Sequence, residues 1–176
     1  MSRKVAVVTG AGSGIGRACA IRLAAEGHAV GVLDLNLEAA EAVAAEILAV
    51  GGEAVAAYVD VSDRAKVNAA MQQVREALGP VLVLVNNAGY STTTSFMKTD
   101  DELWDKVIAV NLNSVYYCCQ AALPDMLAAK WGRIVNISSS STLGGQPFMV
   151  HYVAAKSGVN GLTKALALEY GPKGIT

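Results

Sequence analysis

The chain has 176 residues, of which 53% are hydrophobic and only 16% are charged, with a formal net charge of −1. This length suits one domain with a substantial core, and we expect a single domain over residues 1–176. The charge is near neutral and shows no basic run, which argues against nucleic acid or a membrane surface as partners. Charged residues interrupt every apolar stretch, so no membrane span is predicted.

The three cysteines, Cys19, Cys118 and Cys119, show neither a disulfide framework nor the spacing of metal ligands. We therefore expect buried free thiols and no metal site. No signal peptide is predicted, because Arg3 and Lys4 lead directly into an apolar strand. These features favour a reducing, cytoplasmic location.

Apolar runs typical of buried strands alternate with helical stretches along the chain. Strands are expected at Val5–Thr9 and at 28–33, 54–59, 81–85 and 133–137. Helices are expected at 17–26, 37–50, from Ser62 or Asp63 to about Gly79, at 102–130 and at 152–170. This alternation predicts an α/β fold with a doubly wound parallel sheet.

The long helix at 102–130 has two further sequence features. Thr99 and Glu102 have the spacing of a capping box, which predicts the start of the helix. Pro124 lies inside it and is expected to kink it.

The glycine-rich turn at 10–16 has the context of a dinucleotide site, because a strand precedes it and a helix follows it. Gly10 allows the tight turn, Gly14 lets the backbone approach a pyrophosphate, and Gly16 lets the helix pack near the strand. The N-terminus of the helix offers free N–H groups to the phosphates. The alternative is a glycine-rich turn without a ligand.

Asp34 ends the second predicted strand, about 20 residues beyond the glycines, which is the position of a carboxylate that binds the adenosine ribose. Such a carboxylate repels a 2′-phosphate. Neither Leu35, which follows it, nor Ser13 in the glycine turn offers a cation to NADP, and Arg17 is the one basic residue nearby. The sequence therefore predicts NAD, with NADP less favoured. The alternative role for Asp34 is a helix cap, although Asn36 can fill that role.

Tyr152 and Lys156 lie one helical turn apart in the last predicted helix, so they share one face. A neighbouring ammonium favours the phenolate form, which makes a phenol a usable acid or base near neutral pH. Ser139 lies upstream, near the end of the fifth strand, where its hydroxyl can hold a substrate oxygen. The three residues predict proton transfer to or from an alcohol or a carbonyl.

These motifs, in this order, resemble the short-chain dehydrogenase/reductase family over the whole chain. The turn beginning at Thr9 matches the family's TGxxxGIG, Asn86–Gly89 matches NNAG, and Asp60–Val61 matches an adenine-pocket motif. The resemblance implies a Rossmann-type sheet with strand order 3-2-1-4-5. Asp60 has a plain alternative as a turn residue. The predicted cofactor-binding residues are Gly10, Ser13, Gly14, Ile15, Gly16, Asp34, Asp60, Val61, Asn87, Ala88, Gly89, Tyr152 and Lys156.

The resemblance also implies a catalytic tetrad of Asn111, Ser139, Tyr152 and Lys156. Tyr152 would exchange the substrate proton, and Lys156 would favour the phenolate and bind the nicotinamide ribose. Ser139 would position the substrate oxygen, and Asn111 would hold a water behind Lys156. Alternatives stay open: a neighbour in the run 138–141 can replace Ser139, and Asn111 can simply bond backbone inside a buried helix.

The expected function is hydride transfer between NAD(H) and a secondary alcohol or ketone, apolar or cyclic. Residues 90–97 and 143–151 are expected to contact this small-molecule substrate, and no Arg or Lys stands out there for a charged head group. The first alternative is a 3-oxoacyl-thioester reductase, acting on acyl-carrier protein or coenzyme A substrates. The second is a cofactor-binding protein without turnover.

The second alternative follows from the last residues, 171–176, where the family begins its sixth strand. We expect the last strands of the family and its substrate lid to be missing, with an unpaired sheet edge and an open apolar groove. The helices at 102–130 and 152–170 are apolar on more than one face. By resemblance they would form a subunit interface, giving a homodimer or homotetramer.

Overall fold

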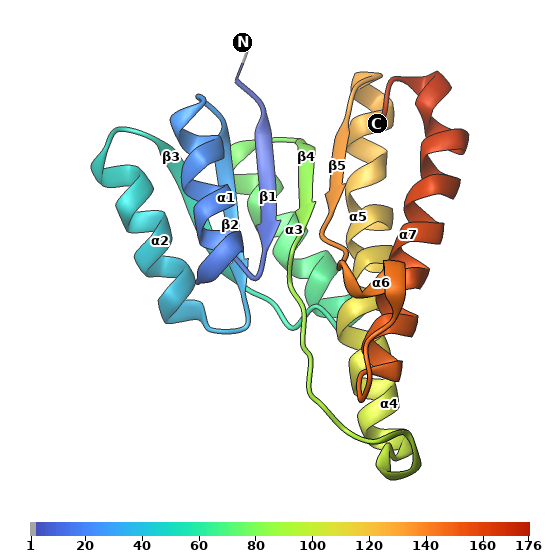
Figure 1. The fold of residues 1–176 in the computed structure, drawn as a ribbon. Helices are drawn as coiled ribbons and strands as arrows, with labels where there is room; N and C mark the ends of the chain where they lie inside the picture. Colours follow the sequence, from blue (N-terminus) through green and yellow to red (C-terminus); the bar gives the residue numbers. More distant parts are fainter. Residues whose placement is uncertain (1–2) are drawn as a thin grey trace.

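In a computed structural model, which describes residues 3–176, five parallel strands form one sheet with helices on both faces (Figure 1). The strands are β1 (Val5–Thr9), β2 (Ala29–Asp34), β3 (Glu53–Tyr58), β4 (Val81–Asn86) and β5 (Arg133–Asn136). Their order is β3-β2-β1-β4-β5, and this confirms the predicted doubly wound sheet. The order reverses between β1 and β4, and ligands of such sheets bind beyond the strand ends at that point.

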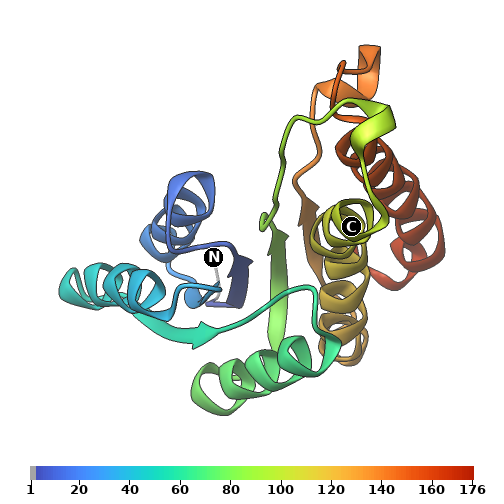
Figure 2. The ribbon, with the colours of Figure 1, turned by 90° about the horizontal axis from the view of Figure 1, so that it is seen from below.

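Two layers of helices cover the sheet. Helices α1 (Gly14–Ala25) and α2 (Leu37–Ala49) pack on one face, against a cluster that includes Val8 and Val32. Helices α3 (Arg64–Leu78), α5 (Ser114–Ala129) and α7 (Val150–Tyr170) share the cluster that contains Val7 and Leu84. Figure 2 looks along the molecule from the side at which β1 ends and separates these two groups. Successive strand residues point to opposite faces, so the continuous apolar run of β1 is buried on both sides.

Short polar side chains start the helices on either side of β3. Asn36 caps α2 by accepting a hydrogen bond from the N–H of Ala39 at 3.1 Å, as the sequence predicts. Asp63 caps α3 and accepts from the N–H groups of Ala65 and Lys66. Of the two predicted caps for α3, the aspartate therefore fills the position.

The predicted capping box of the long helix is wrong. Helix α4 (Asp101–Ile108) begins after Asp100, whose carboxylate accepts a hydrogen bond from the N–H of Leu103 at 2.8 Å. Thr99 instead donates its hydroxyl hydrogen to the carbonyl of Ser95. The Asp100 carboxylate lies one residue nearer to the helix than Thr99 and satisfies a free N–H group of its first turn. With Asp100 as the cap, a capping box needs a glutamate or glutamine at position 103, and Glu102 lies one residue too early.

The long helix is also interrupted. A π-helical turn, η2 (Ala109–Asn113), separates α4 from α5, and the N–H of Ser114 bonds the carbonyl of Ala109 five residues back. The side chains of Asn111 and Ser114 donate to the carbonyls of Val107 and Val110, each four residues earlier. These side chains take carbonyls that a regular helix reserves for backbone N–H groups. Helix α5 then runs past Pro124.

Other boundaries differ from the prediction at their ends. Helix α1 begins at Gly14 instead of residue 17, and α7 begins at Val150 instead of residue 152. The structure also contains elements that the sequence did not predict. They are the short helix α6 (Ser141–Gly144) and two 3₁₀ turns, η1 (Phe96–Lys98) and η3 (Gly171–Lys173). Short helices bury little apolar surface and leave a weak periodic pattern.

Strand β5 forms one edge of the sheet. Ile175 bridges to Gly132 in parallel, and the N–H of Ile134 donates to the carbonyl of Thr176 at 2.9 Å. A small apolar groove of about 40 Å³ lies beside this edge, between β5 and the last turns of α7. Within residues 3–176, no helix has both the length and the apolar character needed to cross a membrane.

Candidate active site

A cavity of about 550 Å³ opens where the carboxyl ends of β1, β2 and β4 meet. It contains every predicted cofactor-binding residue except Gly16, Tyr152 and Lys156. Its lining residues are Gly10, Ser13, Gly14, Ile15, Asp34, Leu35, Val59, Asp60, Val61, Asn87, Ala88, Gly89, Tyr90, Lys106 and Val110. The fold therefore brings the glycine turn, the aspartates and the NNAG segment to one place.

Gly16 lies behind the cavity, where helix α1 packs against the chain. A Cβ atom there would lie 2.1 Å from the carbonyl oxygen of Gly10 and 2.5 Å from Nδ2 of Asn87, so no side chain fits. Nδ2 of Asn87 donates to the carbonyls of Thr9 and Gly10, at 3.0 and 3.1 Å. The hydroxyl of Thr9 accepts from the N–H groups of Asn87 and Ala88. These contacts hold the glycine turn and the end of β4 together around the cavity.

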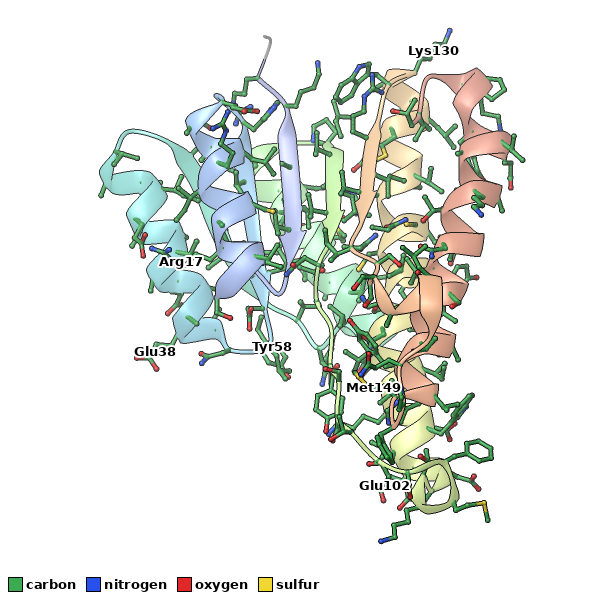
Figure 3. All side chains as sticks on the ribbon, in the orientation of Figure 1. Arg17, Glu38, Tyr58, Glu102, Lys130 and Met149 are labelled. Carbon is green, nitrogen blue, oxygen red and sulfur yellow. The ribbon has the colours of Figure 1, made fainter. Side chains whose placement is uncertain are left out.

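Asp34 lies in the cavity wall and braces the glycine turn. One carboxylate oxygen accepts from the N–H of Gly12 at 2.8 Å, and the other accepts from the N–H of Asn36 at 2.9 Å. The capping alternative fails for Asp34, because Asn36 caps α2. Arg17 does not line the cavity; it forms an ion pair with Glu46 at 2.5 Å, between α1 and α2 (Figure 3).

Asp60 closes a turn, as its alternative role predicts, and it also lines the cavity, while its role in an adenine pocket stays a prediction. It lines the cavity, and one of its oxygens accepts from the N–H of Ser62 at 3.0 Å and from the Ser62 hydroxyl at 2.6 Å. The Ser62 hydroxyl is the main reason that the pKa of this carboxyl lies below its ordinary value, while burial acts in the opposite direction. Asp60 is therefore an anion in the cavity wall at neutral pH.

Tyr152 and Lys156 lie on one face of α7, as predicted. Nζ of Lys156 is 5.8 Å from the centroid of the Tyr152 ring and donates to the carbonyl of Ile137, just beyond β5, at 2.8 Å. Lys156 is buried, and burial lowers the pKa of its ammonium. The contact with Ile137 ties this end of α7 to the sheet.

Gly89 connects this pair with the cavity. A Cβ atom at Gly89 would lie 3.8 Å from Nζ of Lys156 and 3.0 Å from Oδ1 of Asn111, so the glycine leaves room for both side chains beside the cavity wall. Asn111 is fully buried in η2. It donates to the carbonyls of Tyr90 and Val107 and accepts from the N–H of Tyr90. These contacts agree with the alternative that Asn111 bonds backbone groups inside a buried helix. The proton-relay role of Asn111 stays a prediction.

Ser139 lies between β5 and α6, two residues before the helix begins and close to the predicted position. Its hydroxyl pairs with that of Ser141 at 2.9 Å, and it also accepts from the Ser141 N–H. Within residues 3–176 no hydrogen bond joins Ser139 to Tyr152. Asn160 on α7 donates to Thr142 on α6 at 3.1 Å, so the serine segment is attached to the helix that carries Tyr152. The substrate role of Ser139 stays a prediction.

A second hollow of about 580 Å³ lies between the two segments that the sequence assigns to the substrate. It is lined by Thr93, Thr94, Ser95, Lys98 and Phe148. The N–H of Thr94 donates to the carbonyl of Phe148 at 2.8 Å and joins the segments. Lys98, one residue beyond the first predicted segment, also lines this hollow, and it was not among the residues that the sequence assigned to the substrate.

The cysteines are free, as predicted, and Cys118 and Cys119 are buried in α5. Burial raises the pKa of both thiols to about 12. They stay protonated at neutral pH and serve as core residues.

The chain matches the short chain dehydrogenase family over residues 4–176. It is 45% identical over 175 residues to a cyclohexanol dehydrogenase of Acinetobacter sp. strain SE19, covering 99% of this chain and 70% of that protein. It is 44% identical over 174 residues to a 3-oxoacyl-[acyl-carrier-protein] reductase of Staphylococcus aureus, covering 98% of this chain and 71% of that protein.

A solved structure from Sinorhizobium meliloti 1021, described as a candidate short-chain alcohol dehydrogenase, superposes with a TM-score of 0.95 at 38% identity. The superposition covers 99% of this chain and 69% of that one. The cavity, the glycine turn and the Tyr152–Lys156 pair agree with this relationship. The chain belongs to the short-chain dehydrogenase family and is an NAD(P)-dependent oxidoreductase of alcohols and carbonyl compounds.

Proposed function

We propose that the protein binds NAD(H) in the cavity and interconverts an apolar secondary alcohol and its ketone. The observation that carries this proposal is the position of Gly89, which lines the cavity and lies between Asn111 and Lys156. The proton-transfer residues and the cofactor cavity therefore share a wall. When bound, the dinucleotide supplies or accepts the hydride, and the protein supplies orientation and proton transfer.

Each residue of the predicted tetrad has a separate role in proton transfer. The Tyr152 phenol exchanges a proton with the substrate oxygen, and the Lys156 ammonium lies 5.8 Å from the centre of its ring. The Lys156–Ile137 hydrogen bond keeps that ammonium beside the tyrosine. Ser139 holds the substrate oxygen, and Asn111 fixes the backbone of Tyr90 at the edge of the cavity.

The preference for NAD over NADP rests on the charges around the adenosine end. Asp34 and Leu35 line the cavity and offer no cation, and Arg17 is engaged by Glu46. A 2′-phosphate beside Asp34 would meet a like charge. We expect the carboxylate of Asp34, fixed by the N–H groups of Gly12 and Asn36, to accept hydrogen bonds from the ribose hydroxyls.

The second candidate is reduction of a 3-oxoacyl thioester. Lys98 and the hydroxyls of Thr93, Thr94 and Ser95 offer hydrogen-bond donors to a polar carrier, and one similar protein is such a reductase. The alcohol stays our first choice because exposed apolar side chains, Leu143, Phe148 and Val150, occupy the other predicted substrate segment.

The experiment replaces Tyr152 by Phe, which removes only the phenolic hydroxyl. We expect kcat/KM to fall by about 100-fold or more, the range of general acid–base catalysis, while NADH binding measured by fluorescence stays unchanged. Tyr58→Phe removes a hydroxyl from an exposed tyrosine outside the cavity and is the matched control (Figure 3). Substantial turnover by Tyr152→Phe would overturn the assignment. The wild type is assayed with a cyclic secondary alcohol and with a 3-oxoacyl thioester, and the larger kcat/KM identifies the substrate class.

Asp34→Ala tests the cofactor preference. We expect the ratio of the NADPH and NADH dissociation constants to fall by roughly tenfold, because a like charge is removed from the 2′-phosphate. Glu38→Gln removes a carboxylate at the start of α2 that does not line the cavity, and it should leave the ratio unchanged (Figure 3). An unchanged ratio for Asp34→Ala would remove Asp34 from the ribose site.

We propose in addition that the protein acts in a reducing, cytoplasmic environment, which its free cysteines support. We also propose a homodimer or homotetramer that uses the exposed sides of α5 and α7. These two helices lie side by side at one end of the sheet (Figure 1), and both expose large apolar side chains.

A further inference from the structure

The cofactor cavity contains a cation that none of the sequence motifs supplies. Lys106, in the second turn of α4, lines the cavity together with Tyr90 and Val110. Two carboxylates, Asp34 and Asp60, line the same cavity. Of the described lining residues, Lys106 is the only one with a positively charged side chain. Without it, the wall would present only negative charge to an anionic ligand.

The ammonium of Lys106 lies over an aromatic ring. Its Nζ is 4.6 Å from the centroid of the Tyr90 ring. In the part of the chain that the structure describes, Lys106 takes part in no ion pair, so no carboxylate neutralises it. The positive charge therefore remains available to a ligand.

The backbone of Tyr90, whose ring lies beneath the ammonium, is fixed by hydrogen bonds with Asn111. Asn111 accepts from the N–H of Tyr90 at 3.2 Å and donates to its carbonyl at 2.7 Å. Asn111 itself is fully buried and bonded to Val107, one residue after Lys106. The aromatic platform and the helix that carries the lysine are thus fixed by the same side chain.

The other cations near the cofactor and catalytic residues are engaged elsewhere. Arg17 pairs with Glu46 and does not line the cavity. Lys156 is buried and donates to the carbonyl of Ile137. A dinucleotide carries phosphate charges that two carboxylates of the cavity repel. Besides the N–H groups at the start of α1, Lys106 is the positively charged side chain of the lining that can attract them.

We propose that Lys106 is an anion-binding residue of the cofactor cavity, with its ammonium on a phosphate group of the dinucleotide and Tyr90 holding it in position. The proposal rests on the proposed function, because it takes the cavity to be the cofactor site. Lys106 would give the cofactor a charged contact from α4, in addition to the contacts from the glycine turn and α1.

The test is direct binding, measured by calorimetry on Lys106→Gln with NADH, NADPH, ADP and adenosine. We expect affinity for the phosphate-bearing ligands to fall by roughly tenfold at low ionic strength, the range of a charge-assisted hydrogen bond. Salt screens such a contact, so the difference from wild type should shrink as ionic strength rises. Adenosine, which carries no phosphate, should bind both proteins equally.

The ligands identify which phosphate is bound. A loss shared by ADP, NADH and NADPH places Lys106 on the diphosphate. A loss confined to NADPH would overturn the proposal, because NADH carries no 2′-phosphate. Unchanged affinities for all ligands would overturn the proposal, and so would an equal loss for adenosine. Lys130→Gln makes the same charge change at the opposite end of the molecule and should have no effect (Figure 3).

Variants of Tyr90 test the platform. Tyr90→Phe keeps the ring face and should bind like wild type, whereas Tyr90→Leu should lose affinity for ADP by a few fold. In the Lys106→Gln background, Tyr90→Leu should cause no further loss. An undiminished further loss would show that Tyr90 acts independently of the lysine. If wild type fails to bind NADH, the proposed function fails; if wild type binds and Lys106→Gln binds equally, only this inference fails.

Discussion

At the scale of single residues, the polar side chains of the cavity also close their own turns. Asp34 accepts from the N–H groups of Gly12 and Asn36, and Asp60 accepts twice from Ser62. A carboxylate whose oxygens are already bonded holds a fixed orientation before a ligand arrives. Such preorganisation reduces the conformational freedom that binding would otherwise remove.

The variant Ser62→Ala tests whether the Ser62 hydroxyl sets the pKa and the orientation of the Asp60 carboxylate. The Ser62 hydroxyl lowers the pKa of Asp60, so its loss should raise that pKa toward the ordinary value. A carboxyl with a lowered pKa in the folded state stabilises the fold above its unfolded pKa of about 3.9, and this stability is lost as pH falls through the folded pKa. The variant should therefore lose up to about 1 kcal/mol at pH 7 and nothing at a pH below both pKa values.

The measurements are an NMR titration of the Asp60 carboxyl carbon and urea unfolding at both pH values. Ser62→Thr keeps the hydroxyl and should titrate close to wild type. A pKa of Asp60 that stays the same in Ser62→Ala would show that the hydroxyl is not its cause.

The predicted site residues that line the cavity belong to short, local motifs. Gly10, Asp34 and the Asn87–Gly89 segment line the cavity because each lies at or just beyond the carboxyl end of a buried strand. Lys106 and Lys98 were missed for a physical reason. Their positions depend on how α4 and η1 fold back toward the sheet, and no local pattern records a contact of that kind.

At the scale of helices and strands, strong apolar periodicity located every strand and most helices, and side-chain competition decided the boundaries. Asp100 displaced Thr99 as the cap of α4, and Asn111 and Ser114 replaced part of a continuous helix by a π-helical turn. The break follows from polar side chains that bond nearby carbonyls, which an apolar pattern does not show. It also turns Asn111 toward Tyr90.

Two glycine substitutions in helices should act in opposite directions. In α1, Gly16→Ala places a methyl group against the carbonyl of Gly10, and the shift it forces should cost about 1–3 kcal/mol. In α7, Gly161 has no atom within 4 Å of an added Cβ, so Gly161→Ala should stabilise by about 0.5–1 kcal/mol. Urea unfolding measures both. Equal stabilities of wild type and Gly16→Ala would show that α1 moves freely away from the glycine turn.

At the scale of the whole molecule, the strand order was predictable, because right-handed crossovers and the family resemblance leave few topologies. The sequence predicted an unpaired sheet edge with an apolar groove, and β5 forms an edge with such a groove beside it. On the side away from β4, the backbone contacts beside β5 within residues 3–176 come from Ile175 and Thr176. Val135 of β5 is half exposed, although β4 is buried on nearly its whole length. How far a strand is buried depends on every element that packs around the sheet. The residues of the strand itself do not encode those elements.

The exposed apolar surfaces of α5 and α7 predict that the protein forms a homodimer or a homotetramer. Apolar side chains face outward from α5 and α7, among them Tyr116, Leu127 and Leu168, and Leu168 is 82% exposed. Burying such a face between copies is favourable at about 25 cal/mol per Å² of apolar surface. Light scattering should therefore give two or four times the chain mass of 18.2 kDa.

Leu168→Glu should shift that mass toward the monomer, because a carboxylate at the centre of an apolar contact has no partner. Leu48→Glu makes the same change on α2, where the leucine is 54% exposed, and should leave the assembly intact. Wild type that scatters as a monomer at working concentration would contradict the interface. If both variants reduce the mass, the copies meet through α2 as well, and the contact does not belong to α5 and α7 alone.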